Sequence, residues 1–286
     1  MKARNGGALA RSAIGACLFL AVALLAPLIA TDRPWIRAQS GEVLLGAPVP
    51  WAPESIDLSA RLRPPDRTHW LGTDDLGRDV LSRLIHGTRV SVSAGVIASV
   101  LAILIGALLG SAAGLGGGGL DRTVLFGIDI VQALPALVLV AAGAAFLSPS
   151  FLTAALLIAA TGWTDCARIV RAESRRIRSL PFVEAARASG SSRSRILTRH
   201  VLPHALPPAL ATAPYVLGAA VLTEASLSFL GLGTPPPTPS WGRALADARG
   251  IITEAWWCVL PPALALLLLI LSARRLGDAL SEAKSD

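Results

Sequence analysis

The sequence is poor in charge. Only 16% of its 286 residues are Asp, Glu, Lys or Arg, whereas soluble globular domains average about 25%. Hydrophobic residues make up 53% of the chain. This balance argues against a soluble enzyme, and it excludes a disordered chain, which combines low hydrophobicity with high charge. We therefore expect a membrane protein.

Cysteine is also scarce. The chain has three cysteines, Cys17, Cys166 and Cys258, and they lie far apart. An odd, scattered set of this kind predicts neither a disulfide framework nor a metal cluster.

Six apolar runs are long enough, or nearly so, to cross a bilayer, which takes about 20 residues of helix. They cover residues 12–30, 90–114, 124–147, 151–163, 207–231 and 256–272. The fourth run is short, and we expect it to continue into the polar region Thr164–Val170. None alternates like a membrane β-strand, so the prediction is an all-α polytopic membrane protein with six transmembrane helices. The first run lacks a clean small-x-small cleavage site, which favours an uncleaved helix over a signal peptide.

The net charge of +7 is unevenly distributed. With both termini in the cytoplasm, the inside segments carry 16 Lys and Arg and the outside segments 10, as the positive-inside rule expects. Residues 164–206 alone hold nine arginines against three carboxylates, a balance of +6. A nucleic-acid interface is a poor explanation, because Phe182 is the only aromatic residue between Thr164 and Leu206.

Local signals predict an elbow inside this loop. Phe182–Ala188 favours a short helix entered through Pro181, which suits a first helical turn. Gly190 can end that helix, because glycine tolerates a left-handed cap. A second short helix is expected over Arg193–Val201, ended by Pro203.

The elbow resembles the cytoplasmic coupling loop of ABC importer membrane subunits. The matching residues are Glu184, Ala185, Ala186, Gly190, Leu202 and Pro203. In that family the loop docks into a cleft on the ATPase subunit and transmits its closure. The family prefers isoleucine where this chain has His200.

Two further segments look like the C-type membrane subunit of dipeptide, oligopeptide and nickel importers. One is Leu71–Leu84 (LGTDDLGRDVLSRL), and the other runs from Glu224 to Gly242 (EASLSFLGLG, then PPPTPSWG). The resemblance extends from about Asp57 to Gly277. It implies a type I importer transmembrane domain in the bacterial inner membrane. The implied partners are a homologous second permease subunit, two ABC ATPase subunits and an extracytoplasmic solute-binding protein.

We divide the chain into an N-terminal helix with an extracytoplasmic segment (1–86) and the transmembrane domain (87–280), with its coupling loop at 164–206. The outer segment is expected to lie as a lariat on the bundle, with an amphipathic helix over Leu71–Leu84. Gly233–Gly242 is expected to cap the outer mouth.

The chain lacks an ATPase signature. Gly116–Gly119 is glycine-rich but is not followed by Gly-Lys-Ser/Thr, so it predicts a turn rather than a phosphate cradle. We expect a transport subunit that is not an enzyme and binds no cofactor itself, with ATP and Mg used by the partner ATPases. His200 and His204 are spaced for one helical face, but two histidines make an incomplete metal site.

Intramembrane carboxylates are functional candidates. Asp129 lies in the third run and Glu224 in the fifth. Either could line the pathway and meet a substrate amine, or be a structural carboxylate bonded to a neighbouring helix. Prolines at 135, 214 and 261–262 can break or bend spans.

Two other functions remain open from the residues alone. A secondary transporter would need coupling-ion sites and usually repeated halves, and a membrane-embedded enzyme would need a catalytic cluster at membrane depth. The substrate is also open: peptides, nickel and other small solutes all fit the resemblance.

Overall fold

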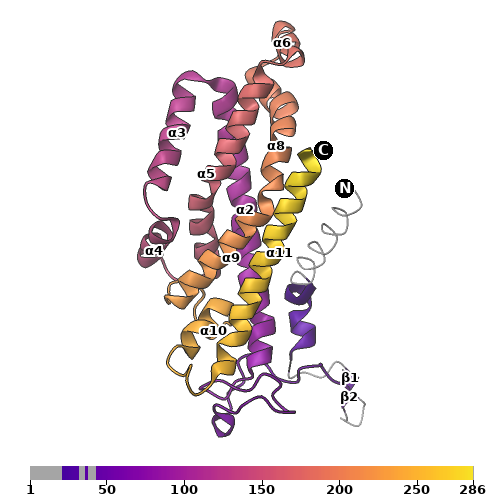
Figure 1. The fold of residues 1–286 in the computed structure, drawn as a ribbon, viewed down its shortest axis with the longest axis vertical. Helices are drawn as coiled ribbons and strands as arrows, with labels where there is room; N and C mark the ends of the chain where they lie inside the picture. Colours follow the sequence, from indigo (N-terminus) through magenta and orange to yellow (C-terminus); the bar gives the residue numbers. More distant parts are fainter. Residues whose placement is uncertain (1–20, 32–35, 38–42, 286) are drawn as a thin grey trace.

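The computed structural model describes residues 21–31, 36–37 and 43–285. Residues 21–29 are helical, while the rest of the first predicted span lies outside the described residues. Two very short strands, β1 (Ile36–Arg37) and β2 (Val43–Leu45), pair antiparallel. The predicted all-α class is confirmed, because helices form the whole of the bundle (Figure 1).

The bundle contains long helices and shorter, bent pairs. The helices are α2 (Val80–Gly116), α3 (Gly118–Gln132), α4 (Ala136–Phe146), α5 (Phe151–Arg178), α6 (Pro181–Ala188), α7 (Arg193–Ile196), α8 (Leu202–Ala211), α9 (Ala213–Phe229), α10 (Trp241–Ala248) and α11 (Leu260–Ser285). Short turns η1 (Leu58–Ala60), η2 (Leu197–Val201) and η3 (Trp256–Cys258) complete the set. Figure 1 places α6 at one end of the bundle and α10 at the other, hereafter the α6 end and the α10 end.

Two of these helices, α2 and α11, are long and apolar enough to span a membrane alone. The third and fifth predicted spans are bent. α3 and α4 meet at 85°, and the helix ending in α8 meets α9 at 58°. The breaks lie just before Pro135 and Pro214, because proline lacks the N–H that would continue the preceding helix.

Pro261 and Pro262 bend nothing, and here the sequence prediction was wrong. They lie in the first turn of α11, where the missing N–H has no helical partner to lose. Pro203 likewise starts α8 rather than ending a helix. The π-helical turn η2 connects α7 to α8, with the Leu202 N–H donating to the Leu197 carbonyl.

The fourth apolar run is part of a longer helix. α5 continues through the polar stretch to Arg178, so the predicted loop start at 164 falls inside this helix. α2 likewise begins at Val80 and runs through the predicted boundary at 86/87. The domain division itself stays a prediction.

Glycines bring α2 and α5 into backbone contact. A Cβ added at Gly106 would lie 2.6 Å from the Trp163 carbonyl oxygen, and one at Gly110 would lie 2.5 Å from that of Ala167. Gly114 continues the spacing of four and faces the Arg171 carbonyl at 2.6 Å. Small residues at this spacing allow close packing of membrane helices, which lack a hydrophobic driving force for association within lipid.

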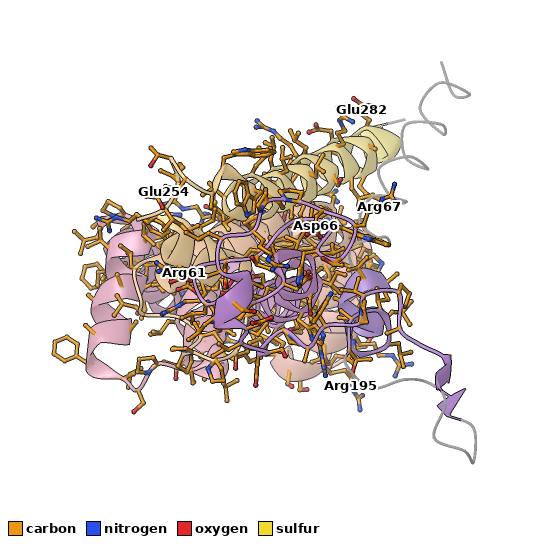
Figure 2. All side chains as sticks on the ribbon, turned by 90° about the horizontal axis from the view of Figure 1, so that it is seen from below. Arg61, Asp66, Arg67, Arg195, Glu254 and Glu282 are labelled. Carbon is orange, nitrogen blue, oxygen red and sulfur yellow. The ribbon has the colours of Figure 1, made fainter. Side chains whose placement is uncertain are left out.

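The loops at the α10 end cover the bundle (Figure 2). Leu71–Asp79 is irregular, so the predicted amphipathic helix over Leu71–Leu84 is wrong before Val80. Asp74 accepts hydrogen bonds from the N–H groups of Leu76 (3.0 Å) and Arg78 (2.9 Å). Such side chain–backbone bonds compete with helix formation.

Charged residues fix these loops to α10. Asp247 on α10 accepts from Arg243 Nε at 2.8 Å and from Arg83 Nη2 at 3.2 Å. Arg78 Nη2 lies 3.4 Å from the same carboxylate, and its Nε donates to Asp74 at 2.7 Å. The arginines at 78 and 83 are buried, so these ion pairs compensate charges that water does not reach.

We expect Gly110→Ala to destabilise the subunit by about 1–3 kcal/mol, because its Cβ meets backbone that cannot yield. The midpoint of thermal unfolding of the detergent-purified subunit should fall. Gly119→Ala is the matched control, since nothing lies within 4 Å of an added Cβ there. Equal midpoints for the two variants would contradict the α2–α5 packing.

Asp247→Ala should cost about 3 kcal/mol, because it removes one partner of buried ion pairs and leaves Arg83 poorly compensated. Faster proteolysis of the loops at the α10 end should accompany a lower thermal midpoint. Glu254→Ala removes an exposed carboxylate at the same end and should leave both measurements unchanged. If the Asp247→Ala variant has the native thermal midpoint and the native rate of proteolysis, the ion pairs do not hold the loops.

Candidate functional site

Helix α6 projects beyond the other helices at its end of the bundle (Figure 1). It begins with Pro181 in its first turn, as predicted. Glu184 and Ala185 are exposed on α6, and Ala186 is half-buried. The helix therefore presents a small-residue face and one carboxylate to the surroundings.

Gly190 ends α6 in the predicted left-handed conformation, with φ of +78°. The Gly190 N–H donates to the Arg187 carbonyl (3.0 Å), and the Ser191 N–H donates to that of Ala186 (3.1 Å). This pair of bonds is the Schellman cap, which satisfies the last helical carbonyls. An added Cβ would meet nothing within 4 Å, so the surface around Gly190 is open.

An apolar cluster joins α6 to the bundle. Val183 is fully buried and packs with Ile177 of α5, Ile196 of α7 and Val201 of η2. The same cluster continues along α5 and α8 and reaches Ile103 on α2. Displacement of α6 is therefore coupled mechanically to the helices beneath it.

The remaining predicted coupling residues start α8. Leu202 packs against this cluster, and Pro203 is exposed. The His200 and His204 rings lie 6.2 Å and 5.5 Å from the Phe182 ring. His204 Nδ1 lies 2.8 Å from the His200 carbonyl oxygen. Within the part of the chain that the structure describes, no group of three His, Cys, Asp or Glu side chains could hold a metal ion.

An open cavity of about 580 Å³ lies among α2, α3, α4, α5 and α9, and several of the side chains that line it are exposed. Most of its lining is apolar or small. Its polar side chains are Gln132, Thr161, Thr164, Asp165, Thr212, Tyr215 and Thr223. This volume lies within the range of about 300–1,000 Å³ found for small-molecule sites.

One lining group, Asp165, was missed by the sequence analysis as a candidate. Gln132 Nε2 donates to Asp165 Oδ1 at 3.0 Å and to Thr164 Oγ1 at 3.1 Å. Asp165 lies about 21 Å along α5 from Phe151, halfway down the helix. The fourth run was expected to continue into Thr164–Val170, but residues from 164 onward were counted with the coupling loop because hydropathy falls after Trp163. The expected continuation was the signal that could have found Asp165, and α5 confirms it.

The two predicted carboxylates do not line this cavity. Asp129 is exposed, and its Oδ1 pairs with Arg168 Nη2 at 3.2 Å, which joins α3 to α5. Glu224 is fully buried in α9, and its Oε1 accepts from Ser228 Oγ at 2.7 Å. Their role as pathway residues stays a prediction.

Residues 102–285 match the family described as binding-protein-dependent transport system inner membrane component. The chain is 37% identical over 237 residues to a probable D,D-dipeptide transport system permease of Escherichia coli, covering 82% of this chain and 80% of that protein. It is 37% identical over 221 residues to the oligopeptide transport system permease OppC of Bacillus subtilis, covering 77% and 72%.

Among solved structures, the inward-facing methionine ABC transporter MetNI matches with a TM-score of 0.58. The match has 21% identity and covers 71% of this chain and 96% of that chain. At this identity it supports the fold alone. The family match and the permease relatives agree with the resemblance in the coupling loop, and the chain belongs to the family of inner membrane components of binding-protein-dependent transport systems.

Proposed function

We propose that the chain and a homologous partner subunit form the translocation pathway of an ATP-driven importer for peptides. Two ABC ATPase subunits bind at the α6 end, and an extracytoplasmic binding protein delivers the substrate at the α10 end. ATP and Mg are used by the ATPases, and this chain contributes neither nucleotide site nor cofactor. It is the membrane component of the system, with several spans in the bacterial inner membrane.

The observation that carries this proposal is the exposed α6 elbow. A short helix whose small-residue face points away from the bundle can enter a cleft on another protein without a steric barrier. Glu184 makes no ion pair with any described residue, so its charge is available to a partner.

The apolar cluster beneath α6 supplies the mechanical link. When the ATPases close and draw the two elbows together, Val183 carries with it the ends of α5 and α8 that lie next to α6. Those helices lead directly to the walls of the cavity, because α5 lines it and α8 is joined to α9. Closure thus opens the pathway outward, and hydrolysis with release resets it inward.

Charge supports the orientation. Arg175, Arg176 and Arg178 lie in the last turn of α5, next to α6. Positive residues at the ends of spans favour the cytoplasmic side. The C-terminal end of α11 lies toward the α6 end in Figure 1, so we also assign the C-terminus to the cytoplasm. An even number of six spans places the N-terminus on the same side.

The substrate assignment rests on the relatives, which are named as permeases for D,D-dipeptides, dipeptides and oligopeptides. A cavity of about 580 Å³ is large enough for a short peptide. Copurification of ATPase subunits with the chain would distinguish an ATP-driven importer from a secondary transporter. Transport by the isolated chain without ATP would contradict the importer function.

Gly190→Asp should abolish uptake and ATPase binding while membrane insertion stays intact. The added carboxylate has room in the free subunit, where the left-handed backbone of a non-glycine residue costs only about 1–2 kcal/mol. We therefore expect the substitution to disturb the complex with the ATPase rather than the fold of the subunit. Gly118→Asp is the control at the same end of the bundle, with a comparable φ of +57° and open space. Uptake by the Gly190→Asp variant at the native rate would contradict the assignment of the α6 elbow as the site where the ATPase docks.

Reconstituted with its partners, the importer should take up radiolabelled dialanine or trialanine in an ATP-dependent manner. The physical reason is the size of the cavity, because a hydrated nickel ion does not fill a volume of about 580 Å³. Radiolabelled nickel serves as the competing substrate. Nickel uptake without peptide uptake would overturn the peptide assignment while leaving the importer assignment in place.

A further inference from the structure

The cavity has an unbalanced charge. Among the described residues that line it, Asp165 alone is charged, so none of them supplies a cation that neutralises the carboxylate. Asp165 makes no ion pair with any described residue. Arg168, one turn further along α5, is paired with Asp129 of α3 instead.

Gln132 holds the carboxylate in place. Its amide N–H donates to Asp165 Oδ1 and to Thr164 Oγ1, which anchors one carboxylate oxygen across the α3–α5 gap. The second oxygen has no hydrogen bond to any described residue. An amide donor of this kind orients the carboxylate without cancelling its charge.

The position of Asp165 leaves its carboxylate accessible from the hollow. The side chain is exposed there, and the residue lies halfway along a helix of 28 residues. Ionisable groups on the helices of a transport pathway face water-filled cavities and mark substrate routes. A carboxylate focused by low-dielectric walls attracts cations from solution.

We propose that Asp165 is the specificity-determining residue of the pathway and pairs with an ammonium group of the substrate as it passes. The substrate class is then a peptide with a free α-amino group or a basic side chain. This inference rests on the proposed function for its substrate, but the charge of the cavity is measurable without one. Gln132 is the positioning residue that keeps the carboxylate turned toward the hollow.

Charged thiol reagents test the cavity directly in the assembled importer. Ala219 is exposed and lines the hollow, so Ala219→Cys provides a reporter, and the parent chain gives the background from native cysteines. A cationic methanethiosulfonate should modify the reporter faster than an anionic one. Adding Asp165→Asn should reduce the ratio of the two rates by about tenfold, whereas Asp165→Glu should retain it.

A remote carboxylate is the matched control. Glu254→Gln removes an exposed charge at the α10 end and should leave the ratio of reagent rates unchanged. A ratio unaffected by Asp165→Asn, or a reporter that neither reagent reaches, would overturn the proposal.

Uptake gives the second readout. With the alanine peptide that the native importer takes up faster, Asp165→Asn should lower the maximal rate about tenfold with little change in KM, because the binding protein captures the substrate. Asp165→Glu should restore most of the rate, which a merely structural defect would not allow. If the Asp165→Asn importer takes up peptide at the native rate, the proposed role of Asp165 is wrong and the importer function stands. If the native importer takes up no peptide but the reagent selectivity is intact, only the peptide assignment is wrong.

Discussion

Helices α2 and α5 lie in backbone contact because α2 presents glycine at every fourth position along their crossing, at Gly106, Gly110 and Gly114. Lipid tails are as apolar as leucine, so bulky side chains gain little by leaving lipid for another helix. Close approach gains dispersion contacts that lipid cannot fully replace. This pair forms the central contact of the bundle, and the bent pairs α3–α4 and α8–α9 pack around it.

The two ends of the bundle are held by different forces. At the α10 end, buried arginines share Asp74 and Asp247, and directional bonds of this kind hold loops in one arrangement. At the α6 end, the elbow is attached through apolar contacts centred on Val183. No ion pair joins α6 to the described part of the bundle. Apolar contacts are non-directional, so this end can shift as a unit while the other stays fixed.

Local signals in the sequence predicted the elbow well, because capping depends on a few neighbouring residues. Pro181 starts α6 and Gly190 ends it as expected. The outer segment was harder to predict. Asp74 accepts hydrogen bonds from the nearby backbone, and these prevent the helix that the apolar pattern of Leu71–Leu84 suggests before Val80. The cavity could not be predicted, because it depends on where α3 and α9 pass α5. Asp165 was counted with the coupling loop although the fourth run was expected to continue past it, because hydropathy does not show how far α5 stays helical while its arginines pair with carboxylates on α3.

Polar contacts between α3 and α5 explain how a charged helix is kept in the bundle. Arg171 donates to both oxygens of Asp121, Arg168 pairs with Asp129, and Gln132 reaches Asp165. The first two contacts neutralise their carboxylates, but the third uses an uncharged amide. A neutral donor is the arrangement that fixes the position of a carboxylate and leaves its charge for another cation. The same set of contacts therefore holds α5 beside α3 and places one uncompensated negative charge in the hollow between them.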